Sequence, residues 1–246
     1  MSTRTFDESW TAVAGVAGWM TRSQAQALYD AAGACPSGGR IVEIGSFQGR
    51  STIVLASAAP KGATVLAIDP HAGNDRGPEE ISGYEAAAED DHATFLANLE
   101  AAGVRDRVTH LRMFSEAALA EIDGEIDVLY IDGAHRYNPA RTDIRDWGRR
   151  VKPGGTLLIH DSFSSVGVTL AIMRELVLGR RFRYVGRSRS LTTYRADLDR
   201  DRLRNAARQL AQLPWFVKNL ALKVALELGL GKVLARLGRS VPEWPY

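Results

Sequence analysis

The segment that decides the fold spans residues 41–52 and reads IVEIGSFQGRST. It predicts a strand that carries an acid near its end, a turn with two glycines, and a helix that begins at Ser51. Glycines suit such a turn because the backbone must bend tightly and can approach a ligand closely. The N–H groups at the start of the helix are available to an anion. The spacing E-x-G-x-x-x-G differs from the dinucleotide fingerprint G-x-G-x-x-G.

On both sides of this segment, short apolar runs alternate with helix-like segments, which indicates an α/β sheet with crossover helices. Five runs are separated by enough chain for parallel neighbours. The last two are separated only by residues 186–190 and predict an antiparallel hairpin. The seven predicted strands are Arg40–Ile44, Thr64–Ile68, Val108–Met113, Asp127–Ile131, Thr156–Ile159, Phe182–Val185 and Leu191–Tyr194.

The composition is that of an ordinary globular protein, with 246 residues, 45% hydrophobic residues and a formal net charge of +2. A single cysteine, Cys35, excludes an internal disulfide and a thiolate-based zinc site, and fits a reducing compartment. The balanced charge gives no reason to expect a nucleic-acid partner. The first ten residues lack the apolar segment of a secretory signal, so we expect a cytoplasmic protein.

Charge divides the chain into two regions. Residues 195–246 hold ten basic and five acidic side chains, so a boundary is expected near residue 197. We predict a main domain over 1–196, with a helical N-terminal cover over 1–36 and an acidic lid insertion over 70–92. Residues 197–246 are predicted to form a basic helical extension. Its second helix, 215–228, is apolar nearly all round and must be covered by the domain, by a homodimer partner or, as a rival, by an anionic membrane.

Polar side chains follow two further strands at the edge where open α/β sheets bind ligands. Asp69 ends the second strand, where a carboxylate can accept hydrogen bonds from both hydroxyls of a ribose. Ser115 follows the third strand and is placed to contact an adenine edge. Together with the glycine turn, these residues predict a nucleoside-type cofactor.

With these motifs, residues 40–162 resemble class I S-adenosylmethionine-dependent methyltransferases, specifically the metal-dependent O-methyltransferases. The resemblance implies a Rossmann-like doubly wound seven-stranded sheet, mostly parallel with an antiparallel terminal hairpin, in a methyltransferase domain over 1–196. It implies that Ser51 holds the methionine carboxylate of the cofactor and that Asp69 binds its ribose. The full set of implied cofactor-binding residues is Glu43, Gly45, Ser46, Gly49, Ser51, Asp69, Ser115, Glu116 and Asp132.

Two further acids, Asp132 and Asp161, end the fourth and fifth strands and should meet at the same edge. Two converging carboxylates repel each other unless a cation neutralises them. Oxygen ligands favour Mg²⁺. In the resemblance both acids match metal ligands of catechol O-methyltransferases, and the third ligand is either His160 or Ser162. Sequences with His-Asp at this position resemble macrolide-glycoside O-methyltransferases and cephalosporin-hydroxylase-like proteins, which favours His160.

His135 lies three residues after Asp132, where the catechol enzymes carry a lysine base. An imidazole titrates near neutrality and can remove the proton of an acceptor hydroxyl, so we expect His135 to be the general base, although it could merely order its loop. The expected function is methylation of a hydroxyl of a sugar, glycoside or polysaccharide-type acceptor. The alternatives are a catechol or phenol O-methyltransferase and a non-methylating hydroxylase-like or accessory protein of the same fold.

Overall fold

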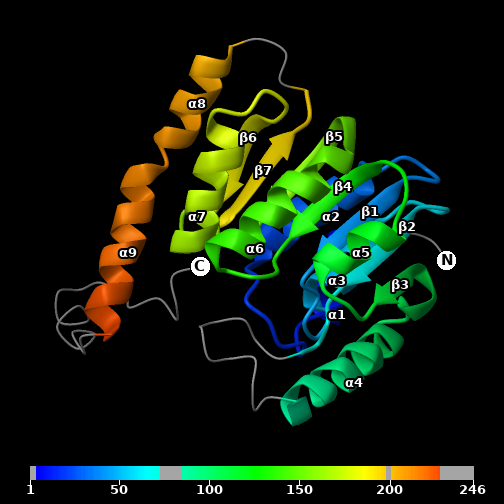
Figure 1. Ribbon diagram of the computed structural model, residues 1–246. Helices are drawn as coiled ribbons and strands as arrows, with labels where there is room; N and C mark the ends of the chain where they lie inside the picture. The colour runs from blue at the N-terminus through cyan, green and yellow to red at the C-terminus, as the bar shows by residue number, and fades with distance from the viewer. Residues whose placement is uncertain (1–3, 73–84, 198–200, 228–246) are drawn as a thin grey trace.

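The computed structural model describes residues 4–72, 85–197 and 201–227. Within these residues, seven strands form one sheet in the order β3-β2-β1-β4-β5-β7-β6 (Figure 1). Strands β1 to β5 pair in parallel, and β7 runs antiparallel to both β5 and β6, which confirms the predicted fold class. The strands are β1 (Arg40–Ile44), β2 (Thr64–Ile68), β3 (Val108–Leu111), β4 (Ile126–Ile131), β5 (Val151–Ile159), β6 (Arg183–Ser188) and β7 (Leu191–Arg195).

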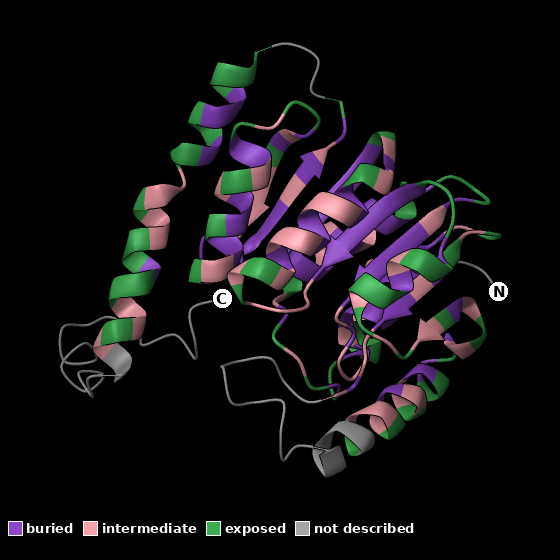
Figure 2. Ribbon diagram, viewed as in Figure 1, coloured by how far each residue is buried: buried purple, intermediate pink, exposed green. Residues whose placement is uncertain are grey.

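Helices cover both faces of the sheet, and Figure 2 shows that its central strands are buried between them. One apolar core lies under α1 (Phe6–Ala12), α2 (Arg22–Gly33), α3 (Arg50–Ala58) and α4 (Glu85–Ala101). The other core lies under α5 (Ser115–Glu121), α6 (Tyr137–Thr142), α7 (Val166–Ile172), α8 (Arg202–Leu210) and α9 (Leu213–Glu227). Short helical turns complete the chain: η1 (Arg105–Arg107), η2 (Asp143–Trp147), η3 (Gly148–Arg150) and η4 (Met173–Val177).

The strand order reverses between β1 and β4, and this reversal positions the site. From β1 the chain moves outward through β2 and β3, and then returns to the other side of β1 through β4 and β5. The loops that leave β1 and β4 therefore turn toward opposite faces of the sheet. A crevice forms between them, at the point where open α/β sheets bind ligands.

Two segments differ from the sequence prediction. Strand β5 begins at Val151 and not at Thr156, because Val151 pairs with Ile126 before a register shift. The break between the last two helices falls at residues 211–212, because Pro214 is accommodated in the first turn of α9, where its missing N–H costs nothing. Residues 73–84 of the predicted lid lie outside the described part of the chain, and α4 begins at Glu85.

The C-terminal helices pack against the domain. The side chain of Asn205 in α8 accepts a hydrogen bond from the Tyr184 amide at 2.7 Å and donates one to the Phe182 carbonyl at 3.1 Å. From α9, Trp215 and Phe216 pack against the second core. None of the described helices is long and apolar enough to cross a membrane.

Candidate active site

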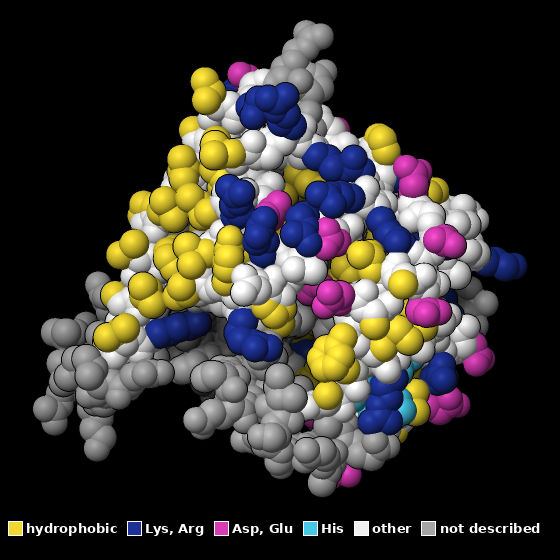
Figure 3. Space-filling model, in the orientation of Figure 1, with side chains coloured by type: hydrophobic (Ala, Val, Ile, Leu, Met, Phe, Trp, Pro, Cys, Tyr) yellow, Lys and Arg dark blue, Asp and Glu magenta, His cyan; other side chains and the backbone are white. Residues whose placement is uncertain are grey.

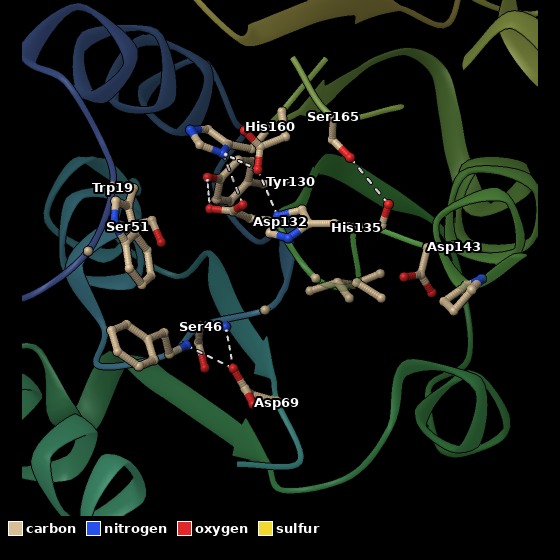
Figure 4. A pocket seen from close by; sticks show the side chains of 18 of the residues that line it. Trp19, Ser46, Ser51, Asp69, Tyr130, Asp132, His135, Asp143, His160 and Ser165 are labelled. Carbon is tan, nitrogen blue, oxygen red and sulfur yellow. Dashed lines mark hydrogen bonds and ion pairs between the residues drawn. The ribbon is translucent and has the colours of Figure 1, made fainter. Parts of the chain in front are cut away.

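A cavity of about 530 Å³ opens at the carboxyl ends of β1, β2, β4 and β5. The loop after β1, residues 17–20 before α2 and side chains of α7 and α9 contribute to its walls. Figure 4 shows Ser46 and Asp69 at one end of the cavity and Asp132, His135 and His160 at the other. The cavity therefore joins the predicted cofactor loop to the predicted acidic centre.

Glycine is required at two positions of the cofactor loop. Gly45 has a φ of +86°, and a Cβ there would lie 2.3 Å from the carbonyl oxygen of Asp132. Gly49 has a φ of +89° and is the N-cap residue of α3. The first glycine thus lets β1 approach the end of β4, and the second turns the chain into the helix.

Replacing Gly45 with alanine is therefore expected to destabilise the protein by roughly 2–4 kcal/mol, because the clash is with backbone in a strained conformation. Thermal unfolding and cofactor binding would measure the loss. Gly186→Ala is the matched control, since a Cβ at Gly186 meets nothing within 4 Å. Equal melting temperatures for the two variants would contradict the requirement for glycine at position 45.

Asp69 shapes the same loop. Its Oδ2 accepts hydrogen bonds from the amides of Ser46 and Phe47, each at 2.8 Å, and its Oδ1 accepts one from the amide of His71 at 2.8 Å. Each carboxylate oxygen can accept two bonds, so Oδ2 is fully used and one acceptor position remains on Oδ1 of this cavity-lining residue. Ribose binding by Asp69 stays a prediction, and the structure adds a second role for this residue in holding the loop.

Glu43 does not line the cavity and lies behind residues that do. It is fully buried and accepts hydrogen bonds from the hydroxyls of Ser51 and Thr52. Among the described residues Ser51 lines the cavity and Glu43 does not, so Glu43 acts through the helix that follows the loop. Burial raises the pKa of Glu43 to about 8, against the hydrogen bonds from the two hydroxyls.

Replacing Glu43 with glutamine is expected to remove a pH dependence of stability. Because folding raises the pKa of Glu43 from 4.5 to about 8, the folded state binds an additional proton between these values, and stability falls as pH rises across this window. Glutamine is neutral throughout. The melting temperature of the variant should vary less than that of the wild type over this range. Glu8→Gln, at an exposed helix cap, should leave the wild-type slope unchanged, and an unchanged slope in Glu43→Gln would contradict the assignment.

A second buried acid, Asp143, closes the far end of the cavity. The hydroxyl of Ser115 donates to its Oδ1 at 2.5 Å, and both residues line the cavity, whereas the predicted contact Glu116 does not. Burial raises the pKa of Asp143 to about 6. Sequence reasoning did not select Asp143, because an acid within a helical segment gives no sign that it faces inward.

The acidic centre combines Asp132, His135 and Asp161. One potential ligand atom from each lies within 4.8 Å of the others. His135 Nε2 lies 2.7 Å from Asp161 Oδ2, and the buried hydroxyl of Tyr130 donates to Asp132 Oδ2 at 2.7 Å. Asp161 Oδ1 is buried and accepts no hydrogen bond from the described residues. The convergent set thus contains His135 where the sequence led us to expect His160.

Charge perturbs the protonation of this centre. Burial alone would raise the pKa of Asp161, but His160 and His135 facing it hold that pKa well below its usual range. Burial alone would lower the pKa of His135, but its hydrogen bond to Asp161 and the charges of Asp161 and Asp132 raise it. Asp161 is therefore held ionised, which suits it to bind a cation.

His160 lies behind the two carboxylates. Its Nδ1 is 3.1 Å from Asp132 Oδ1 and 3.6 Å from Asp161 Oδ2. Its Nε2 lies 3.3 Å from the side-chain nitrogen Nε2 of Gln24, a fully buried residue of α2. The other candidate ligand, Ser162, donates to the Ile159 carbonyl and pairs with a hydroxyl of β7, and it does not line the cavity.

The orientation of Gln24 determines which ring nitrogen of His160 carries hydrogen. Gln24 Oε1 accepts from the amide and hydroxyl of Thr21 at 2.8 and 2.9 Å in a helix capping box, so its NH₂ group faces His160. An NH₂ donor needs a lone pair on Nε2, so the singly protonated ring carries its hydrogen on Nδ1. Burial would lower the pKa of His160, but the charges of Asp132 and Asp161 raise it well above its usual value and favour a second proton on the ring. His160 thus presents N–H to the two carboxylates, which fits a positioning role. Its ligation of a metal stays a prediction.

Gln24→Glu tests this hydrogen-bond assignment. Glutamate keeps an oxygen for the cap at Thr21 and places a second oxygen against Nε2, so His160 should become doubly protonated over a wider pH range. Two-bond ¹⁵N correlation spectra of the ring measure this directly. Gln26→Glu, on the exposed face of the same helix beside Asp30, is the control. A wild-type ring that carries hydrogen on Nε2 alone would contradict the assignment.

The predicted N-terminal cover closes the cavity from the side of α2. The rings of Trp19 and Phe47 stack with centroids 5.6 Å apart, and both residues line the cavity. Arg50, at the start of α3, donates to the carbonyls of Val16 and Gly18 at 2.9 and 3.2 Å. The segment before α2 is therefore tied to the cofactor loop and forms an aromatic wall beside it.

Comparison with known proteins agrees with this site. A family model described as a methyltransferase domain matches residues 42–162, which contain the cofactor loop and both acids of the centre. Residues 42–162 therefore match a methyltransferase domain, and the sheet has the fold of solved O-methyltransferases, which confirms the resemblance to class I S-adenosylmethionine-dependent methyltransferases; metal dependence stays a prediction.

Individual relatives are distant. The O-methyltransferase NovP has a TM-score of 0.57 at 15% identity, covering 72% of this chain and 80% of its own. Cofactor-bound Rv0187 from MTB has a TM-score of 0.56 at 20% identity, covering 78% and 88%. TomG from Streptomyces achromogenes, in complex with S-adenosylmethionine, has a TM-score of 0.53 at 16% identity, covering 78% and 89%. The uncharacterized protein y4gI of Sinorhizobium fredii is 26% identical over 129 residues, which are 50% of this chain and only 13% of that protein.

Proposed function

We propose that this protein transfers the methyl group of S-adenosylmethionine to a hydroxyl of a sugar, glycoside or polysaccharide-type acceptor, with a divalent cation at the acidic centre. The observation that carries the proposal is the convergence of Asp132, His135 and Asp161 within 4.8 Å beside a cofactor loop of methyltransferase type. This arrangement brings two carboxylates, an imidazole and the loop that would bind the cofactor to one cavity, as methyl transfer to oxygen requires.

The acidic centre fits a divalent cation. Asp161 is held ionised by the two histidines that face it, and its Oδ1 is a buried acceptor without a hydrogen bond from the described residues. Carboxylates are preferred ligands of Mg²⁺ and Mn²⁺, and these two acids would hold the ion. When bound, such an ion makes a coordinated hydroxyl more acidic.

His135 would take up the proton of the acceptor. In the reaction an oxygen–carbon bond forms to the methyl group while the carbon–sulfur bond breaks, and the sulfonium becomes a neutral thioether. The hydroxyl proton would pass to Nδ1 of the His135 ring, because Nε2 lies 2.7 Å from Asp161 Oδ2 and carries the hydrogen of that pair. Asp161 then stabilises the imidazolium, because an adjacent carboxylate favours its charged form.

The cofactor and the acceptor would occupy different parts of the cavity. Ser46, Asp69 and the Ser115–Asp143 pair offer hydrogen bonds for the polar groups of the cofactor. On the acceptor side, the serines at 164 and 165 line the wall near His135. Hydroxyl-rich walls suit a polyol, which supports the sugar-type acceptor over a purely apolar one.

A phenolic acceptor is the second candidate, and the stacked pair of Trp19 and Phe47 favours it. Aromatic walls hold planar rings by offset or edge contacts. In either case the reacting group is a hydroxyl, and the choice of acceptor is separate from the chemistry at His135.

Product analysis tests the proposal. We expect the purified protein to convert S-adenosylmethionine to S-adenosylhomocysteine with a glycoside from an acceptor panel, to lose this activity to a chelator, and to regain it with Mg²⁺. Turnover with phenols and with no glycoside would show that the acceptor is a phenol. Cofactor binding without turnover on any glycoside or phenol would favour the non-methylating alternative.

A further inference from the structure

Helix α9 has two apolar faces, and only one of them is covered. The inner face packs against the domain through Trp215 and Phe216, and Asn219 donates to the Phe163 carbonyl at 3.3 Å. On the opposite face Val217 is 61% exposed and Val224 is 50% exposed. These positions lie seven residues apart and share one side of the helix, together with Leu220. A helix that is apolar on both sides needs a second surface against which its outer apolar side chains are buried.

The exposed apolar face continues onto α7 at the opening of the cavity. Val166 and Leu170, one helical turn apart, are 49% and 51% exposed. Val166 and Leu220 both line the cavity and both reach solvent, so they lie at its mouth. Figure 3 shows hydrophobic side chains gathered over α7, α8 and α9 on this side of the molecule. An apolar surface of this kind marks an interaction site.

The basic side chains beside this face indicate which kind of partner it binds. Residues 201–225 of the described chain hold four exposed basic side chains, Arg202, Arg204, Arg208 and Lys218, and one acidic side chain, Asp201; Lys223 faces inward and donates to the Ser164 carbonyl at 3.0 Å. Two copies of such a surface would repel each other, whereas an anionic surface attracts it. Apolar side chains beside lysine and arginine are the composition by which interfacial helices bind bilayers.

We propose that the outer face of α9, with Val166 and Leu170 of α7, docks on an anionic lipid bilayer. The apolar side chains enter the headgroup boundary, and Lys218 and its basic neighbours contact the lipid phosphates. Docking in this way holds the mouth of the cavity at the membrane surface. The proposal rests on the composition of this face and is independent of the acceptor.

Vesicle flotation of the full-length protein tests the proposal. We expect binding to vesicles that contain phosphatidylglycerol, little binding to phosphatidylcholine alone, and release by salt, because exposed charges are screened. Val217→Glu should weaken binding about tenfold. Val185→Glu is the matched control, since Val185 is 41% exposed on strand β6, outside this face. Lys218→Gln should also weaken binding, and Lys61→Gln, in the loop before β2, should not.

Cofactor affinity and melting temperature should stay at wild-type values in Val217→Glu, because Val217 does not line the cavity. Binding that is equal for both lipid compositions, or equally reduced by Val217→Glu and Val185→Glu, would overturn the proposal. So would a stable dimer in sedimentation experiments that Val217→Glu dissociates, because a second copy would then cover the face.

Discussion

Replacing Asp161 with asparagine is expected to lower the rate of methyl transfer by about 10³-fold and to abolish tight binding of Mn²⁺ or Mg²⁺. The physical reason is the loss of the charge that the centre supplies: Asp161 is the buried acid whose Oδ1 has no hydrogen-bond donor among the described residues. Asparagine keeps the shape of the side chain. It also tolerates the backbone conformation at this position, where φ is +53°.

Two measurements separate a chemical effect from a structural one. We expect Asp161→Asn to remain folded, because the backbone carbonyl still accepts from the amides of Ser164 and Ser165, and its melting temperature to fall below that of the wild type because the pairs with His135 and His160 lose their charge. Metal titration, followed by calorimetry or by the Mn²⁺ spin signal, should show the loss directly. Asp197→Asn, which breaks a surface ion pair with Arg183, is the control. Wild-type metal affinity in Asp161→Asn would refute the cation site.

The central sheet was predictable from the sequence because its strands are covered on both faces. Buried parallel strands appear as continuous apolar runs, and β4 is buried at every position. The ends of β1 and β2 match the prediction for this reason. The start of β5 was not predictable, because residues 152–155 have the composition of a turn, and only the pairing of Val151 with Ile126 of β4 brings the strand to begin before them.

The candidate site was predictable only where residues follow strands directly. Asp69, Asp132 and Asp161 end predicted strands, and the topology brings them to one edge. Gln24 and Asp143 carry no such signal. The contact between Gln24 and His160 joins residues 136 positions apart, so it depends on how α2 docks against β5. The local sequence pattern cannot predict a contact between residues that only the tertiary fold brings together.

His135→Gln is expected to lower kcat by about 10²–10⁴-fold, the range typical for loss of a general base. Its effect on the KM for S-adenosylmethionine should be small, because the cofactor loop lies at the other end of the cavity. The wild-type rate should rise with pH through the pKa of His135, which the neighbouring carboxylates raise above its ordinary 6.5. A base works only when unprotonated, so the ascending limb should disappear in the variant. His92→Gln, which does not line the cavity, is the control.

Metal affinity decides between the two roles that the geometry allows for His135. Its Nε2 lies with ligand atoms of Asp132 and Asp161, so the ring could bind the cation through Nε2, or keep the Nε2 hydrogen against Asp161 and receive the proton at Nδ1. As the base, it can be replaced by glutamine with only a small change in Mn²⁺ affinity, while kcat falls. As a ligand, its replacement should weaken Mn²⁺ binding by about 10–100-fold and lower the rate in proportion. In that case excess metal would restore turnover, and the proton would have to leave by another group. Because the glutamine variant has no imidazole to accept the proton, recovery of full activity at saturating Mn²⁺ would exclude His135 as the base.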